Sequence, residues 1–508
     1  MKHRFKLIKL SFALMVVFFQ VTSCSKKNTS PITSSATPSA PPPIANVVLD
    51  SITIANKVDT LVISKRYKFV IVGFYSNKTS KDLSDSISLT IDNTNATLLN
   101  KNIIGAKSGL LTATISYLNF TLNKNLYIHN IEDADIDTFL GTPVSNASLI
   151  VPIVIINYLP TIDGINQDMN KAPDDYWVLK NSTLAESKKR ILGQQKITKY
   201  GIEEGTRFRQ FNNIQKVDPY VGIKVIKYFN VYEINLINWI KGFKTLDYDS
   251  LFKKLNMADL VNNAGVKEIW ITCFNKDAYP SILNSQYNDP NTFYGLPESN
   301  MSTPTSSGDI SNSIKIPNDL PIYSKTYVVY GNSVFRGAET NIHNRGHQIE
   351  CQLNYIEDNT MAPKENNALY ANLFEGINPS LGNKPLNRVG MTHFPPNTTI
   401  DYDYNNLTLV DSDIKSWVPS GGKYEKVNSL LWTSIKYDYN LVNQYTMGGL
   451  NTVDDYSKDP QYKWLVFWFQ SIPSKNNNIP FGNTTLSNWW DLFYNWDDAI
   501  KNKKSLHN

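Results

Sequence analysis

Apolar and polar side chains alternate in short segments over the first part of the chain after residue 43, and turn residues separate these segments. Leu110–Tyr117 and Tyr67–Val72 are examples. A period of two places successive side chains on opposite faces of a strand, and short strands at regular spacing are typical of a β-sandwich. The pattern therefore predicts an all-β domain over residues 44–136, which ends with the acidic run Glu132–Asp135 as a connector.

Three segments of this region resemble the bacterial Ig-like group 2 family. They are Asn93–Leu99, Ile104–Gly109 and Thr112–Ser116. In that family a turn glycine precedes a strand with alternating Thr and Ile, whereas the tryptophan usual on a central strand is replaced here by Leu89 or a neighbour. The resemblance implies an Ig-like sandwich of the kind that serves as a spacer or an adhesive module. We interpret this one as a spacer, because no titratable groups cluster in it.

After the connector, longer apolar runs alternate with helical stretches. Val151–Tyr158 is continuously apolar, as strands buried on both faces are. Further strand-like runs lie at 222–231, 265–273 and 325–331, and helical stretches at 184–194, 248–263 and 336–355. This alternation predicts a large α/β domain over residues 148–508, with a loop-rich and aromatic-rich part beyond about Pro379. The predicted fold class is therefore multidomain, an Ig-like β-sandwich followed by an α/β domain.

Residues 1–23 have the layout of a secretory signal peptide. A basic start is followed by an apolar run from Leu10 through Phe19, which is shorter than the about 20 residues of a membrane span. Val21–Cys24 resembles the lipobox of bacterial lipoproteins, which implies cleavage before Cys24 and acylation of that cysteine. An ordinary signal peptide ahead of an incidental cysteine is the alternative.

The stretch 24–43 is rich in Ser, Thr and Pro and cannot bury enough apolar surface to fold. We interpret it as a flexible tether between a lipid on Cys24 and the folded part. The predicted location is the cell envelope, on a membrane. Lys26 and Lys27 stand where one bacterial group has acidic residues that accompany surface display, so the periplasm and the cell surface both stay open.

Removal of the signal changes the charge of the chain. The formal net charge is +5, and the signal carries Lys2, Arg4, Lys6 and Lys9, so the mature chain is near 5 − 4 = +1. That balance argues against a nucleic-acid partner, which requires a concentrated basic surface. Two further cysteines, Cys273 and Cys351, either form a disulfide or stay buried thiols.

The densest group of titratable side chains falls in the predicted helix 336–355. Glu339, His343, His347 and Glu350 are spaced by four, four and three residues, which places them on one helix face. Two histidines at i and i+4 can ligate one metal ion, and a carboxylate one turn on can complete or orient the set. This stripe therefore predicts a metal site or an acid–base site.

The opposite side of this helix carries Asn344, Arg345, Gln348 and Gln352, a composition that suits water. Gly346 costs about 1 kcal/mol against alanine inside a helix. We infer that another part of the molecule approaches the backbone closely at this position.

The segment resembles the H-E-x-x-H helix of metalloproteases, but Asn344 stands where that family has its general base. Glu339, Glu350 or Glu298, which follows the 265–273 run, could supply a catalytic carboxylate, and His393 could be the third ligand beside His343 and His347. The predicted cofactor is a divalent metal such as zinc. Metal-free acid–base chemistry and a purely structural polar helix are the alternatives.

Two further patterns near the C-terminus predict binding. Asp401–Asn405 begins like a calcium loop, but Asn406 and Ser412 exclude an EF-hand, and a looser calcium site with Asp411 or Asp413 stays open.

Tryptophan is concentrated in the same region, and indole faces both stack on sugar rings and pack cores. Trp464–Trp468 reads as core, whereas Trp489 and Trp490, after a Gly/Asn-rich loop, are the candidate ligand platform.

These features predict a secreted, lipid-anchored hydrolase that acts on an extracytoplasmic polymer, a glycan or a peptide, with a metal ion. The alternative is a non-catalytic glycan-binding or structural surface lipoprotein.

Overall fold

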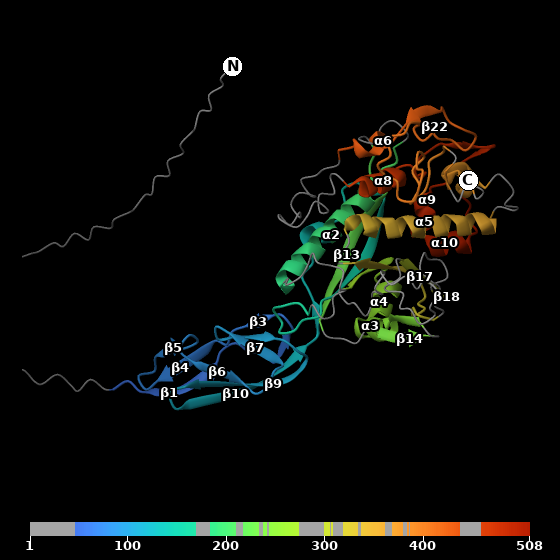
Figure 1. Ribbon diagram of the computed structural model, residues 1–508. Helices are drawn as coiled ribbons and strands as arrows, with labels where there is room; N and C mark the ends of the chain where they lie inside the picture. The colour runs from blue at the N-terminus through green and yellow to red at the C-terminus, as the bar shows by residue number, and fades with distance from the viewer. Residues whose placement is uncertain are drawn as a thin grey trace, which may run out of the picture. The chain divides into compact units, whose positions relative to one another are not determined.

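The protein is a multidomain, β-rich molecule with several sheets and a set of helices, seen here in a computed structural model (Figure 1). The structure describes residues 46–168, 183–209, 217–232, 237–240, 243–273, 299–304, 306–307, 318–333, 337–360, 368–378, 384–385, 387–436 and 459–508. The signal peptide, Cys24 and the tether lie outside these residues, and so does Glu298. Contacts group residues 49–508 into one unit, so the boundary between the two predicted folded domains stays a prediction.

The first ten strands form three small sheets. Their orders are β1-β4-β5, β2-β10-β9-β6 and β3-β8-β7. The strands are β1 (Leu49–Ile54), β2 (Thr60–Val62), β3 (Arg66–Tyr67), β4 (Ile71–Tyr75), β5 (Ser80–Asp82), β6 (Ser88–Ile91), β7 (Ala96–Leu99), β8 (Asn102–Gly105), β9 (Gly109–Tyr117) and β10 (Phe120–His129). The alternation read at 110–117 is confirmed, because Leu111, Ala113 and Ile115 of β9 are buried in one apolar core.

Part of the acidic run Glu132–Asp135 is a strand rather than a loop. Its first part belongs to strand β11 (Ile131–Asp133), which pairs antiparallel with β13 (Val221–Val231). The carboxylate of Glu132 is buried and accepts hydrogen bonds from Asn230 at 2.9 Å and from Tyr232. The partners of Glu132 lie about a hundred residues away in the sequence, so the sequence around the acidic run does not reveal them.

The largest sheet has seven strands in the order β11-β13-β12-β16-β19-β17-β18. Its centre is parallel: β12 (Leu149–Tyr158) runs parallel to β13 and to β16 (Glu268–Cys273), which runs parallel to β19 (Tyr327–Ser333). At one edge, β17 (Ser299–Thr303) and β18 (Ser306–Ser307) run antiparallel. The four apolar runs of the sequence thus form the central strands.

Helices cover both faces of this sheet. Ile153 and Ile155 of β12 belong to the core with α2 (Leu184–Gly205), α5 (Ala338–Thr360) and α8 (Pro460–Phe469). Val154 and Ile156 point the other way and pack with α3 (Tyr248–Lys254) and α4 (Met257–Asn262). The helix predicted at 248–263 is in fact this pair, because Asn256 between them has a φ of 51° that ends the first helix.

The remaining elements are short. They are α1 (Thr138–Gly141), β14 (Ile237–Ile240), β15 (Phe243–Leu246), the π-helix η5 (Leu369–Glu375), β20 (Ile377–Asn378), β21 (Lys384–Pro385), β22 (Val410–Ser412), β23 (Glu425–Val427), α6 (Leu430–Thr433), β24 (Pro480–Phe481), β25 (Thr484–Thr485), α9 (Trp489–Tyr494) and α10 (Trp496–Lys501). Among the described helices, none combines the length and the apolar character that a membrane crossing requires.

The side of α5 that was expected to face water is buried instead. Asn344, Arg345, Gln348 and Gln352 are each at most 1% exposed. Arg345 forms a 2.7 Å ion pair with Glu268 of β16 and stacks on nearby aromatic rings, so its charge is compensated inside the molecule. The prediction failed because a polar helix face suits either water or buried polar partners, and composition does not separate the two.

Candidate metal centre

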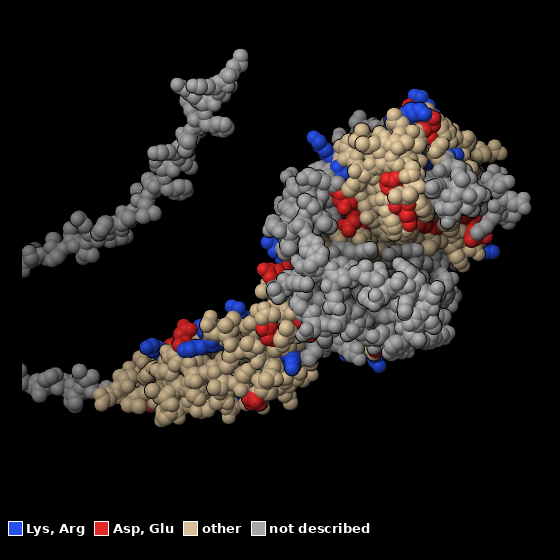
Figure 2. Space-filling view, viewed as in Figure 1, with Lys and Arg blue, Asp and Glu red and all other residues tan. Residues whose placement is uncertain are grey.

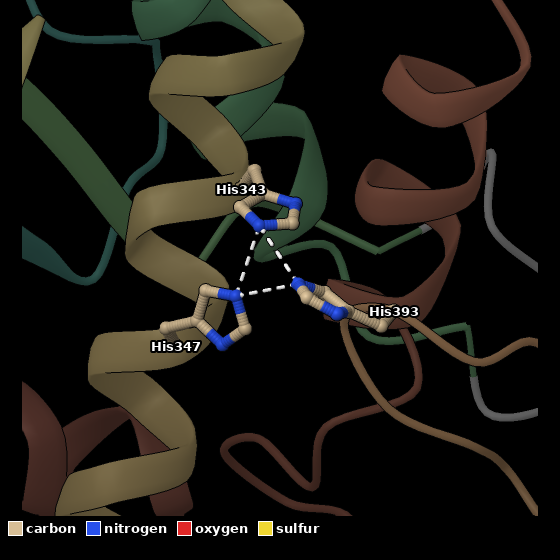
Figure 3. Close-up of side chains that lie close together, drawn as sticks. All are labelled: His343, His347 and His393. Carbon is tan, nitrogen blue, oxygen red and sulfur yellow. Dashed lines mark hydrogen bonds between the residues drawn. The ribbon is translucent and has the colours of Figure 1, made fainter. Parts of the chain in front are cut away.

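Three imidazoles converge at one point next to α5 (Figure 3). His343 and His347 lie one turn apart on that helix, and His393 comes from a loop. The Nε2 atom of His347 lies 2.9 Å from Nε2 of His343 and 2.9 Å from Nε2 of His393, and the third distance is 3.1 Å. Three nitrogens about 3 Å apart can all lie about 2.1 Å from one ion, which is the usual Zn–N distance.

The outer nitrogens of all three rings also have partners. Nδ1 of His347 lies 2.8 Å from Glu350, and Nδ1 of His393 lies 2.9 Å from Asp401. Nδ1 of His343 lies 3.1 Å from the side-chain amide of Gln461, at the start of α8, and a half-turn of that amide presents its oxygen to the ring. Partners of this kind orient the imidazoles of metal sites.

These partners make the centre a good fit for a cation. A carboxylate at Nδ1 keeps the ring proton there, so Nε2 of His347 and Nε2 of His393 both present lone pairs. Two lone pairs 2.9 Å apart repel each other unless a proton or a metal ion lies between them. Burial, helped by the neighbouring His347, lowers the pKa of His393 and favours the neutral ring that binds metals.

Glu350 ties the helix to the loop that carries His393. One of its oxygens faces Nδ1 of His347, and the other accepts a 2.8 Å hydrogen bond from the backbone N–H of Thr392. Burial alone would raise the pKa of Glu350, but His347 and the hydrogen bonds from His347 and Thr392 lower it below its usual value. Glu350 was predicted to be catalytic. Because both of its oxygens are engaged, the structure gives it an orienting position instead.

Gly346 makes room for this loop, as the sequence indicated. A Cβ atom at Gly346 would lie 2.4 Å from Oγ1 of Thr392. Any larger residue would push the loop away from α5. The glycine therefore sets the spacing at which His393 meets the two helix histidines.

Aromatic side chains bind the backbone of the loop that carries His393. Trp464 and Trp468 of α8 donate from their indole nitrogens to the backbone oxygens of Met391 (3.1 Å) and Gly390 (2.9 Å). Tyr404 donates to the backbone oxygen of Thr392 at 3.1 Å. The core position predicted for Trp464–Trp468 is confirmed, and these tryptophans also fix the loop behind the metal centre.

Glu339 lies one turn before His343 in α5, on the same face. Its Oε1 accepts from the backbone N–H of Gly337 at 3.1 Å and from Thr340 at 3.3 Å, and its Oε2 is buried without a partner among the described residues. Burial and the nearby Asp459 raise the pKa of Glu339 to about 7. A carboxyl group with such a pKa can both take up and release a proton near neutral pH.

Trp489 and Trp490 do not form a ligand platform, and that prediction was wrong. They are 1% and 2% exposed, so their ring faces are covered. The indole nitrogen of Trp489 donates to the backbone oxygen of Leu506 at 2.9 Å, and its ring packs edge-on against Phe374. The loop before them does not expose them, because α9 turns both rings into the core.

The calcium site is not formed either. The carboxylate of Asp401 lies 2.9 Å from Nδ1 of His393. Asp411 forms an ion pair with Lys426 at 2.7 Å, and Asp413 is buried beside Arg388. In the described part of the chain, one cluster of at least three His, Cys, Asp or Glu side chains is close enough to share an ion. Its members are His343, His347 and His393.

Solvent reaches the centre from the side of the loop. His343 and His347 are 4% and 8% exposed, whereas the side chain of His393 is 20% exposed and Tyr402 beside it is 52% exposed. A cavity of about 610 Å³ lies elsewhere, bounded by residues that include Tyr220 and Asp491, and none of the three histidines lines it.

The sequence did not predict the contacts that Gln461, Thr392 and Asp401 make at this centre. Asp401 follows His393 by eight residues, a proximity that could have suggested the pair. Gln461 is 118 residues from His343, and nothing in the sequence signals their contact.

Comparison with known proteins adds little. No protein family matches the chain, and no curated protein is similar to it. Among solved structures, the crystal structure of the S-layer protein SbsC domains 4 and 5 aligns with 16% of this chain at 12% identity and a TM-score of 0.13. The match spans about half, 53%, of that chain.

Proposed function

We propose that this protein is a metal-dependent hydrolase of the cell envelope, held on a membrane through a lipid on Cys24. Its substrate is an extracytoplasmic polymer, a glycan or a peptide. The observation that carries the proposal is the convergence of three Nε2 atoms within 3.1 Å of one another, each ring with a partner at Nδ1. Three histidine ligands that leave a further position open are typical of catalytic zinc sites.

For a peptide bond or an ester linkage in such a polymer, a zinc ion held by the three histidines would polarise the scissile carbonyl group and activate water. Glu339 takes a proton from the water molecule while the oxygen of the water adds to the carbonyl carbon. Glu339 then passes that proton to the leaving nitrogen or oxygen as the C–N or C–O bond breaks. The raised pKa of Glu339, its place on the histidine face and an Oε2 without a partner among the described residues support this role.

The fold assignments belong to the same proposal. We infer that residues 44–136 form an Ig-like spacer and that residues 148–508 form an α/β domain. Small sheets around one shared core support the first, and four central parallel strands between two helical layers support the second.

The charge distribution supports a partner other than nucleic acid. On the face shown in Figure 2, basic and acidic side chains are interspersed over the β1–β10 part. The glycan-binding alternative draws no support from Trp489 and Trp490, because both are buried.

Metal analysis of the full chain tests the proposal. We expect about one zinc ion per wild-type chain after dialysis, and loss of that ion in His347→Ala and in His393→Ala. His129→Ala, at an exposed strand end, is the matched control and should keep the metal. A wild-type chain that folds and binds no divalent transition metal would remove the proposal.

Activity is tested with p-nitrophenyl acetate, a simple ester. Glu339→Gln should keep the metal and lower turnover by at least about 100-fold, the usual contribution of a general base. Unchanged turnover in this variant would exclude Glu339 as the base.

A further inference from the structure

Tyr402 has an unusual backbone conformation next to the metal centre. Its φ is +61°, in the left-handed region that bulky side chains rarely adopt. Strain of this kind is kept where the surrounding structure enforces it, and it gathers at functional sites.

Both neighbours of Tyr402 are fixed by hydrogen bonds. Asp401 accepts from the imidazole of His393, and Asp403 accepts from the backbone N–H of Thr399 at 3.1 Å and from Asn406 at 2.7 Å. These hydrogen bonds hold the residues on both sides of Tyr402, and one of them is to His393. The strained backbone at Tyr402 and the position of His393 are therefore linked through Asp401.

The ring of Tyr402 lies against the converging imidazoles. Its centroid is 4.3 Å from that of His393 and 5.8 Å from that of His343, to which it is nearly parallel. Tyr402 is also half-exposed, at 52%, whereas His343 and His347 are buried. A molecule that approaches the Nε2 atoms from this side meets the tyrosine on its way.

The charges around the centre restrict the substrate. Carboxylates contact two of the three imidazoles: Glu350 lies beside Nδ1 of His347, and Asp401 lies beside Nδ1 of His393. The negative charges of these carboxylates would repel a phosphate group, whereas an uncharged carbonyl group would not be repelled. The centre therefore suits an amide or an ester.

We propose that Tyr402 is a catalytic residue of this centre, which donates a hydrogen bond from its phenol to the carbonyl oxygen of an amide or ester substrate. The inference rests on the proposed metal-dependent hydrolysis. A hydrogen-bond donor aimed at the oxygen on which charge develops stabilises the transition state. The ring would at the same time form one wall of the entrance.

Binding of acetohydroxamate to the cobalt-substituted full chain tests this role without a known substrate. Acetohydroxamate presents a carbonyl oxygen to a metal ion, and the visible absorption of cobalt reports its binding. We expect Tyr402→Phe to bind one cobalt ion per chain, to keep the wild-type melting temperature, and to raise the Kd for acetohydroxamate about tenfold, the loss of one hydrogen bond. Tyr424→Phe, which removes another exposed tyrosine hydroxyl, should match the wild type.

A second variant separates the hydroxyl from the backbone strain. Tyr402→Gly should raise the melting temperature, because glycine adopts this φ without strain, and should still weaken acetohydroxamate binding. A Kd for Tyr402→Phe within twofold of the wild type would overturn the inference while leaving the metal centre in place. Absence of cobalt binding in the wild type would instead overturn the proposed function.

Discussion

Gly346 and Thr392 are packed so closely that a methyl group on the glycine would lie 2.4 Å from the threonine hydroxyl oxygen. This contact sets the distance between α5 and the loop that carries His393. The geometry of the candidate metal centre thus depends on a residue that carries no side chain at all.

Gly346→Ala should therefore damage the metal centre although alanine is the better helix former. We expect a loss of about 1–3 kcal/mol in the free energy of unfolding, the usual cost of overpacking, and weaker zinc binding. Denaturant unfolding and a competitive zinc titration measure the two effects. Adding Thr392→Ala, which removes the two nearest atoms, should restore part of both, and a double variant no better than Gly346→Ala would contradict the steric account.

Glu350→Gln should lower zinc affinity by about 10–100-fold, because the amide orients His347 without the negative charge. A chelator competition assay measures this change. Asp401→Asn should have a smaller effect, since the side chain of Asp401 is 54% exposed and water screens its charge. Equal zinc affinities for Glu350→Gln and the wild type would show that the carboxylate does not tune the centre.

Arg345 and Glu268 form a buried ion pair in which each side chain is at most 2% exposed. Removing one partner leaves the other charge uncompensated, so Arg345→Met and Glu268→Gln should each cost about 3–5 kcal/mol of unfolding free energy. The double variant should cost clearly less than the sum of the two. Additive losses in urea unfolding would show that the two residues do not stabilise each other.

Stability at acid pH should depend on Glu132. Burial opposes its ionisation, but hydrogen bonds from Lys65, Tyr232 and Asn230 and the charge of Lys188 lower its pKa to about 2. Because the folded-state pKa lies below the unfolded value of 4.5, this group stabilises the fold above pH 4.5 and loses that contribution as the pH falls toward 2.

Glu132→Gln should accordingly lower the unfolding free energy by about 1–3 kcal/mol at pH 7 and by progressively less below pH 4.5. Urea unfolding from pH 7 to pH 3 measures the difference. Asp85→Asn, at an exposed carboxylate, is the control and should follow the wild type. A constant difference between Glu132→Gln and the wild type at all pH values would contradict the role of ionisation.

Cys24→Ala should release the protein from the membrane fraction, because a lipid on Cys24 would be its anchor. Fractionation of cells with an antibody against the folded part shows where the variant goes. Wild-type protein that fractionates as soluble would contradict the lipid anchor.

Local sequence patterns predicted those features that depend only on residues close together in the chain. The apolar run at 151–158 became the central strand β12, and the spacing of His343 and His347 placed two ligands side by side. Gly346 was read correctly because a glycine inside a helix is costly unless something approaches it.

Long-range contacts explain what the sequence did not reveal. Polar residues such as Arg345 were expected at the surface, since their partner Glu268 lies 77 residues away. Trp489 was assigned to a binding surface because its neighbours look like a loop, although tertiary packing buries its ring. The contact between Gln461 and His343 follows from the packing of α8 against α5, which no local pattern specifies.

The third imidazole of the centre comes from a separate loop, 46 residues beyond His347. An ion bound there would act as a cross-link that the unfolded chain cannot form. By thermodynamic linkage it would add about 4 kcal/mol to the unfolding free energy when free zinc is a thousand times its Kd. The supply of zinc would then set the lifetime of the folded protein, and a chelator would loosen the fold.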